Sequence, residues 1–372
     1  MFDRLGPAMR RALAAVRASD PMEATRVIQA ALTNSELQEG AEPPKKNRPR
    51  PHAATATKRM SLGETLTQLR SGADITSLLP VQTPTLPKGS SFLKRSIATH
   101  AGSRDYRLYV PSSGRPRGLI VMLHGCKQNA EDFAVGTAMN LVADGEDMLV
   151  AYPVQAQSAN ATRCWNWFRP EDQRRDTGEP HILAEVTRAI LREYGLEGRA
   201  FVAGLSAGGA MAAVMGATYP DLYAAVGIHS GLPYRSAQDV SSALAAMRGN
   251  TRNSVPSHVP HTQSSTLPRQ IVFHGTRDHI VVPTNAKALM DAARLSHPTA
   301  QVLERSFTSG SRLVMHTELL AEDGLVKAEA WLIDGASHYW SGGDPRGSYA
   351  KPDGPNASKE MVRFFLGQRH SG

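Results

Sequence analysis

The stretch Arg199–Gly208, which reads RAFVAGLSAG, decides the fold that the sequence predicts. An apolar strand pattern ends at Ala203, and a run of small residues with the composition of a helix begins at Gly209. Between them stands a G-x-S-x-G motif whose small residues suit a sharp strand-to-helix turn. Such a turn lifts the Ser206 hydroxyl above the sheet and points the N-terminus of the next helix at a reacting carbonyl. An inert serine in a glycine-rich turn is the alternative.

Short apolar runs alternate with helical patterns on both sides of this motif. The runs are Tyr106–Val110, Leu119–Leu123, Met148–Tyr152, Ala200–Ala203, Ala224–Ile228, Ile271–Phe273 and Ala330–Ile333. The helical patterns cover residues 131–144, 180–194, 207–218, 235–248 and 284–296. This alternation predicts one α/β domain with a mostly parallel central sheet and helices on both faces.

A serine nucleophile needs a general base, and the base needs an orienting carboxylate. After a turn of this kind the partners follow in the chain order serine, acid, histidine. Asp278 and His338 each lie in a loop just after a predicted strand, so both are expected at the carboxyl edge of the sheet. We predict them as the acid and the base. The alternatives are Asp291, Asp334, His229 and His274.

An oxyanion hole requires two backbone N–H donors near the nucleophile. One is predicted at Ala207, directly after the serine, and the other in the loop His124–Gln128 that follows an earlier strand. Cys126 is the predicted donor of that loop, because Gly125 before it permits close backbone approach. This chemistry requires no metal ion and no organic cofactor.

Aromatic residues gather near the predicted catalytic loops. Trp165 belongs to the run Cys164–Phe168, and Tyr339 and Trp340 directly follow His338. Flat aromatic surface suits an apolar or sugar-like substrate, so Trp165, Tyr339 and Trp340 are predicted to bind substrate, as is Gln128 of the oxyanion loop. Core packing is the alternative for the aromatic residues.

The chain has two cysteines, Cys126 and Cys164, and both fall in loops just past predicted strands. A disulfide between them would fix the oxyanion loop to the aromatic loop. Two buried free thiols are an equally good interpretation, because the sequence does not give the distance between them.

The net charge of +8 is concentrated at the N-terminus. Residues 1–100 carry 15 basic and 8 acidic side chains, whereas residues 101–372 carry 27 and 26. The later part therefore lacks the excess of positive charge expected of a nucleic-acid-binding domain. Residues 1–90 are predicted as a basic arm of short helices and a Pro/Lys/Arg-rich linker, largely disordered, and residues 91–370 as the catalytic domain. The arm is a candidate for contact with an anionic surface or granule, or else a solvated tether.

Neither a membrane span nor an export signal is evident. No stretch approaches the roughly 18–20 apolar residues of a membrane-spanning helix. The apolar run after Arg10 and Arg11 is shorter than the core of a signal peptide. The segment 249–268 has no apolar stripe and is expected to be a lid or a disordered loop.

Five blocks together carry a family resemblance: LHGCKQNAEDFAVGTAMNLVAD, VAYPVQAQSANATRCWNWF, FVAGLSAGGAMAAVMGATYPDLYAAVGIHSGLPY, IVFHGTRDHIVVPTNA and GASHYWSGGDPRGSYAKPDGPNAS. They resemble the esterase family of extracellular type 1 polyhydroxybutyrate depolymerases, which has feruloyl and acetylxylan esterases as near relatives. The resemblance implies an α/β-hydrolase fold, serine esterase activity, the roles given above to Ser206, Asp278 and His338, and a location outside the cell. The absence of a visible signal leaves the cytoplasm as the alternative.

The sequence thus predicts a serine esterase that acts on poly- or oligo(3-hydroxybutyrate)-type esters through an acyl-enzyme. A feruloyl or acetylxylan esterase is the first alternative. A non-catalytic binding protein that keeps a hydrolase fold is a more distant one.

Overall fold

The computed structural model describes residues 83–198, 200–250 and 267–370. The predicted arm lies outside the described residues except for positions 83–90, and most of the predicted insertion at 249–268 lies outside them as well. Within the described residues, no helix combines the length and the apolar character that crossing a membrane requires.

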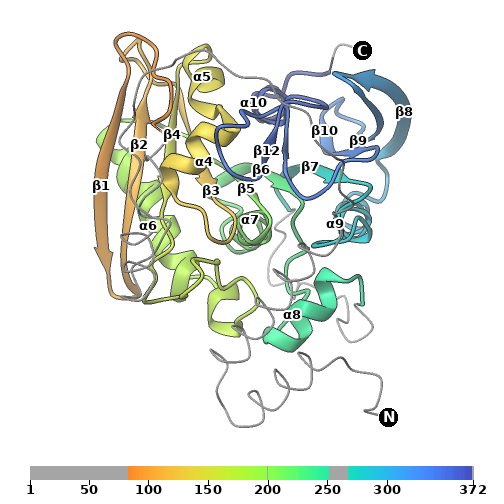
Figure 1. Ribbon diagram of the computed structural model, residues 1–372, viewed down its shortest axis with the longest axis horizontal. Coiled ribbons are helices and arrows are strands. Elements are labelled where there is room, and N and C mark those ends of the chain that lie inside the picture. The colour runs from red at the N-terminus through yellow and green to blue at the C-terminus, as the bar shows by residue number, and fades with distance from the viewer. Residues whose placement is uncertain (1–82, 199, 251–266, 371–372) are drawn as a thin grey trace, which may run out of the picture. The chain divides into compact units, whose positions relative to one another are not determined.

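A ten-stranded sheet forms the centre of the described chain (Figure 1). In sheet order its strands are β1 (Ser91–Thr99), β2 (Gly102–Val110), β4 (Met148–Pro153), β3 (Gly118–Leu123), β5 (Ala200–Leu205), β6 (Tyr223–His229), β7 (Arg269–Gly275), β10 (Val326–Ile333), β9 (Arg312–Leu320) and β8 (Gln301–Ser309). The strands from β4 to β10 run parallel, and β1, β2, β9 and β8 pair antiparallel at the two sides. The carboxyl ends of the parallel strands therefore meet at one edge.

Helices cover both faces of this sheet. The buried side chains of α6 (Gly178–Glu193), α7 (Ala207–Thr218), α8 (Val240–Met247) and α9 (Thr284–Ser296) share one apolar core. Those of α4 (Ala130–Thr137), α5 (Met139–Asp144) and α10 (Ala357–Phe365) belong to a second core. The 3-10 helix η2 (Pro170–Gln173) precedes α6, and β11 (Trp340–Ser341) pairs with β12 (Ala350–Lys351) in a small separate sheet. The predicted α/β fold is confirmed.

The agreement is closest for the parallel strands, since every predicted apolar run lies within or overlaps an observed strand. The predicted helix at 131–144 is two helices, because Ala138 adopts a left-handed conformation with φ 50° and breaks the chain between α4 and α5. The strands β1, β8 and β9 and the helix α10 were not predicted. The missed strands are three of the antiparallel ones at the sides. Exposed polar residues interrupt the apolar pattern in β1 and β8, whereas in β9 the pattern is inverted, with Leu313 and Met315 exposed and His316 and Glu318 buried.

Candidate active site

Ser206 stands at the junction of β5 and α7, with φ 58° and ψ −119°. A positive φ is strained for a residue with a Cβ, and such strain is common at functional sites. The Ser206 N–H donates to the carbonyl of His229 at the end of β6 (2.9 Å), which fixes the turn against the neighbouring strand. The side chain is half-buried at the carboxyl edge of the sheet.

Gly204 and Gly208 make this turn possible. A Cβ on Gly204 would collide with the backbone of Gly208, and a Cβ on Gly208 would collide with the carbonyl oxygens of Leu123 and His124. The turn is therefore packed directly against the loop that follows β3. This close contact is the physical reason for small residues on both sides of Ser206.

Asp278 and His338 form a hydrogen-bonded pair. The His338 Nδ1 lies 2.7 Å from Asp278 Oδ2. His338 belongs to the loop after β10, and Asp278 belongs to the loop after β7. The other carboxylate oxygen accepts the backbone N–H groups of Ile280 (3.0 Å) and Val281 (2.9 Å). Burial raises the pKa of Asp278, but the hydrogen bond from His338 and these donors outweigh it and hold the pKa below its usual value. Asp278 is thus an ionised, oriented partner for the imidazole.

The structure brings Ser206, Asp278 and His338 to the same edge, because β5, β7 and β10 are parallel strands of one sheet. Among the described residues, the hydrogen bond that joins members of this group is the one between Asp278 and His338. The candidate site therefore consists of an oriented Asp–His pair and a serine held in a strained turn.

The alternative acids and bases have other hydrogen-bond partners, although His274 Nε2 also lies 3.5 Å from Asp278 Oδ2. His274 is fully buried, and its Nε2 lies 2.7 Å from the Val281 carbonyl. The His229 Nε2 accepts the backbone N–H of Ser341 (3.1 Å). Burial lowers the pKa of both histidines. The exposed carboxylate of Asp291 pairs with Lys287, and that of Asp334 accepts the hydroxyl of Thr276.

The predicted oxyanion donors are the backbone N–H groups of Cys126 and Ala207. Among the described residues, neither Cys126 N–H nor Ala207 N–H donates to a backbone carbonyl. Ala207 is the first residue of α7, where helix geometry leaves the N–H groups free for an anion. The oxyanion loop, residues 124–128, is closed by a hydrogen bond from Gly125 N to Gln128 Oε1 (2.9 Å).

A disulfide joins Cys126 and Cys164, whose Cα atoms are 4.2 Å apart. Cys126 belongs to the oxyanion loop, and Cys164 belongs to the loop after β4. The bond therefore ties the loop that carries one candidate donor to a second loop at the same edge of the sheet.

The predicted substrate contacts of Trp165 and Trp340 are wrong, because their side chains are 0% and 1% exposed. The Trp165 indole donates to the His124 carbonyl (3.1 Å), and the Trp340 indole donates to Ser358 Oγ (3.1 Å). Both rings are core residues that support the loops from behind. Packing, the alternative interpretation, describes them.

The same correction applies to Tyr339 and Gln128, which are 3% and 2% exposed. The Tyr339 hydroxyl donates to Asp353 (3.2 Å). The Gln128 amide accepts from Gly125 N and donates to Asp132 and to the Ser348 carbonyl, both at 3.0 Å. Gln128 thus shapes the oxyanion loop and has no free surface for a substrate. Burial depends on tertiary packing, which local aromatic composition does not reveal.

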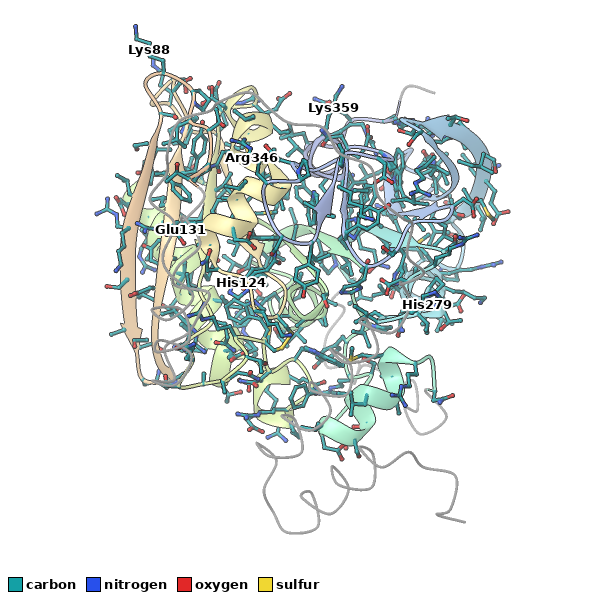
Figure 2. The ribbon with its side chains drawn as sticks, in the orientation of Figure 1. Lys88, His124, Glu131, His279, Arg346 and Lys359 are labelled. Carbon is teal, nitrogen blue, oxygen red and sulfur yellow. A yellow bond between two sulfur atoms is a disulfide. The ribbon has the colours of Figure 1, made fainter. Side chains whose placement is uncertain are left out.

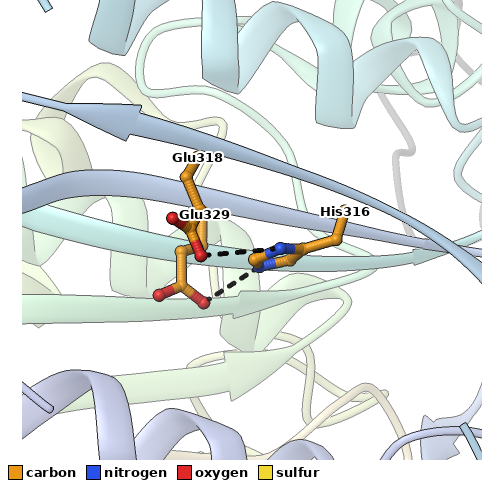
Figure 3. A group of neighbouring side chains, drawn as sticks. All are labelled: His316, Glu318 and Glu329. Atoms are coloured by element: carbon orange, nitrogen blue, oxygen red, sulfur yellow. Dashed lines mark hydrogen bonds and ion pairs between the residues drawn. The ribbon is translucent and has the colours of Figure 1, made fainter. Parts of the chain in front are cut away.

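One group of described side chains has the spacing of a metal ligand set. His316, Glu318 and Glu329 lie together between β9 and β10 (Figure 3). Arg305 pairs with Glu318 (3.0 Å) and Arg363 pairs with Glu329 (2.5 Å). Because arginines already neutralise both carboxylates, the group is an ion-pair network that does not suit a metal ion.

The chain is similar to known esterases in sequence. The family model described as "Esterase PHB depolymerase" matches residues 104–297. Poly(3-hydroxyalkanoate) depolymerase C of Paucimonas lemoignei is 28% identical over 65% of this chain and 60% of its own length. Feruloyl esterase B of Neurospora crassa is 26% identical over 69% of this chain and 86% of its own length. The chain thus spans less than two thirds of the depolymerase.

A solved structure shows the same fold. Acetyl xylan esterase from Aspergillus awamori superposes with a TM-score of 0.55 at 16% identity, over 74% of this chain and 99% of that one. At this identity the likeness supports the α/β-hydrolase fold alone.

Proposed function

Because this chain belongs to the Esterase PHB depolymerase family, we propose that it is a serine hydrolase of carboxylic esters. Ser206 is the nucleophile, His338 the general base and Asp278 the residue that orients the base. The observation that carries the proposal is the 2.7 Å hydrogen bond between His338 and Asp278, at the sheet edge where the strained turn holds Ser206.

The proposed reaction has two halves. The Ser206 hydroxyl attacks the ester carbonyl while His338 takes its proton, and the N–H groups of Cys126 and Ala207 stabilise the oxyanion. His338 then gives the proton to the departing alcohol, which leaves an acyl-enzyme on Ser206. Water, deprotonated by His338, attacks this ester, and the carboxylic acid leaves as the serine regains its proton.

The test is hydrolysis of p-nitrophenyl butyrate by the wild type and by Ser206→Ala. The variant should lose at least about 10³-fold in kcat, because without a nucleophile only binding and oxyanion stabilisation remain. Labelling by a fluorophosphonate should vanish with the activity. Full activity in the variant would refute the proposal, and failure of the wild type to label would favour a non-catalytic binding protein.

The proposed substrates are oligomers or polymers of the 3-hydroxybutyrate type. The family and the depolymerase from Paucimonas lemoignei support this choice. A feruloyl or acetylxylan esterase is the second candidate, supported by the Neurospora crassa relative. Release of product from hydroxybutyrate oligomers, methyl ferulate and acetylated xylan, measured as kcat/KM side by side, separates the two.

We also propose that the enzyme works outside the cytoplasm. The Cys126–Cys164 disulfide supports this, because disulfides persist in oxidising compartments and are rare in the cytosol. Alkylation of the native protein from fractionated cells should modify neither cysteine. Two alkylated cysteines in a cytoplasmic fraction would contradict the proposal.

Residues 1–90 are proposed to act separately from the esterase domain at 91–370, as a basic arm for an anionic surface. Residues 1–90 carry 13 basic and 8 acidic side chains, and this excess of +5 supports the division. Deletion of residues 1–90 should abolish binding to vesicles that contain phosphatidylserine while kcat on a soluble ester stays unchanged. Equal vesicle binding by the two proteins would contradict the role of the arm.

A further inference from the structure

The orientation of the Cys126 N–H is set by its own peptide unit, whose carbonyl belongs to Gly125. The His124 Nδ1 lies 2.7 Å from that carbonyl oxygen. The His124 Nε2 accepts the backbone N–H of Gln155 (3.1 Å), so Nδ1 carries the proton and donates to Gly125. Burial lowers the pKa of His124 to about 4, which keeps the ring neutral and this tautomer in place. The ring lies in the interior of the molecule (Figure 2).

A single carboxylate lies behind this arrangement. Glu179, in the first turn of α6, is 4% exposed and receives four donors from three residues. The Gln155 side chain donates to Oε1, as do Asn166 Nδ2 (2.9 Å) and Arg104 (3.3 Å). The backbone N–H of Asn166 donates to Oε2 (2.8 Å). Glu179 thus fixes side chains and backbone in the loop after β4.

Two routes lead from Glu179 to Cys126. The first passes through Gln155, whose backbone N–H holds His124 and, through it, the Gly125 carbonyl. The second passes through the loop at Cys164, whose carbonyl accepts from the Gln155 side chain (2.9 Å) and whose sulfur is bonded to Cys126. One route reaches the peptide plane of Cys126 and the other reaches its side chain.

We propose that Glu179 is a positioning residue for the oxyanion hole, because it anchors both routes that fix the Cys126 N–H. The inference rests on the proposed function, since the N–H matters only as a donor to the oxyanion. Regular strand hydrogen bonds end before this loop, so side-chain anchors act together with a backbone bond from Lys127 N–H to the Thr162 carbonyl (2.9 Å) in fixing its geometry. Glu179 touches no reacting atom and acts through Gln155 and the disulfide-bonded loop.

The experiment compares Glu179→Gln with Glu329→Gln in the full chain. Glu329 is the matched control, since it is 0% exposed and paired with an arginine but has no bonded route to the oxyanion loop. Both variants should lower Tm, because each removes the negative charge of a buried ion pair. On p-nitrophenyl butyrate, only Glu179→Gln should lower kcat, by about 10- to 100-fold, with KM within about threefold of the wild type.

A tetrahedral inhibitor gives a readout that a merely structural role would not move. A boronic acid that adds to Ser206 places an oxygen in the oxyanion hole, so its Ki should rise in Glu179→Gln by about the factor lost in kcat. The Ki of Glu329→Gln should match that of the wild type. Equal losses of kcat and Ki in the two variants would overturn the proposal.

Gln155→Leu is the second variant and keeps the proposal testable if Glu179→Gln does not fold. It removes the amide that joins Glu179 to the Cys164 carbonyl and leaves the Arg104 and Asn166 contacts intact. Its kcat should fall in the same direction, by several-fold or more. A folded Gln155→Leu protein with the kcat of the wild type would contradict the inference.

The pH profile supplies a third readout. Burial raises the pKa of Glu179 to about 7, and the nearby Asp172 adds to the rise, while Gln155, Asn166 and Arg104 act against it. Protonation would turn a carboxylate that accepts four bonds into a group with a donor facing donors. Below pH about 7, kcat should therefore fall more steeply in the wild type than in Glu179→Gln, and identical slopes would count against the proposal.

The Ser206→Ala result separates the two proposals. If Ser206→Ala is inactive while Glu179→Gln keeps the kcat and Ki of the wild type, the positioning role fails and the esterase function stands. If Ser206→Ala keeps full activity, the proposed function fails, and the positioning role fails with it.

Discussion

Two buried carboxylates of this chain have similar partners but hold different kinds of structure. Glu179 and Glu329 are 4% and 0% exposed, and each pairs with one arginine, Arg104 and Arg363 respectively. The further partners of Glu329, His316 and Trp331, lie in the strands β9 and β10. Those of Glu179 lie in irregular backbone after β4. Similar ion pairs therefore join neighbouring strands around Glu329 and hold an irregular loop around Glu179.

The two carboxylates also differ in pKa. Burial and the neighbouring Asp172 raise the pKa of Glu179 to about 7. Burial acts in the same direction on Glu329, but the hydrogen bond with His316 and the charge of Arg363 outweigh it and lower the pKa. Arg363 and His316 favour the ionised form of Glu329, whereas Glu179 has a second acid, Asp172, beside it. We therefore expect changes at Glu329 to affect stability alone, and changes at Glu179 to affect both stability and activity.

The largest expected effects follow removal of the paired arginines. Arg363→Leu should cost about 3–5 kcal/mol of unfolding free energy, because it leaves the buried Glu329 without its arginine partner, and kcat should stay near the wild-type value. Arg104→Leu should cost a similar amount and also lower kcat, since Glu179 loses one of its donors. Urea denaturation and hydrolysis of p-nitrophenyl butyrate measure the two quantities.

Lys287→Ala is the control for this pair of variants, because it removes the partner of an exposed carboxylate, Asp291. Its unfolding free energy should change by less than about 0.5 kcal/mol. A fall in kcat in Arg363→Leu as large as that in Arg104→Leu would erase the contrast between the two clusters.

The sequence was sufficient for the parallel half of the fold. Strands such as β3 and β5 are buried on both faces, so their continuous apolar runs identify them and place the loops that follow at one edge. Ser206, Asp278 and His338 were predicted from this placement. The strand β8 escaped prediction because its exposed face is mostly polar, and β9 escaped it because polar residues such as His316 are buried there while Leu313 and Met315 are exposed.

The burial of side chains and the hydrogen bonds of Glu179 could not be predicted from the sequence. Arg104 lies 75 positions from Glu179, and only the folded sheet brings them together. The aromatic run around Trp165 looks like a binding surface in sequence, yet the loop turns the indole inward to the His124 carbonyl. In the sequence, Glu179 is an acidic residue in the first turn of a helix, and this position is so common for acidic residues that it does not indicate a special role.

His124, which lies on the route from Glu179 to Cys126, should make the stability of the protein depend on pH. Its pKa of about 4 lies below the ordinary 6.5, so the neutral ring contributes stability above pH 6.5 that is lost as the pH falls toward 4. The loss should reach roughly 3 kcal/mol. His124→Asn cannot titrate, so its deficit relative to the wild type should shrink between pH 7 and pH 4 in urea denaturation. A deficit independent of pH would contradict a buried neutral His124.

The smallest effect is expected at a third carboxylate, Asp353, which is partly open to water and pairs with Arg312 (2.6 Å). Tyr339→Phe removes one hydroxyl donor to Asp353, and the remaining ion pair and solvent should limit the cost to about 0.5–1.5 kcal/mol. Burial raises the pKa of Tyr339 to about 12, so the alkaline limb of kcat below pH 10 should be the same in both proteins. KM should not change either, because the hydroxyl is turned toward Asp353. A raised KM would instead restore the substrate contact first predicted for Tyr339, because the hydroxyl is the group that the variant removes.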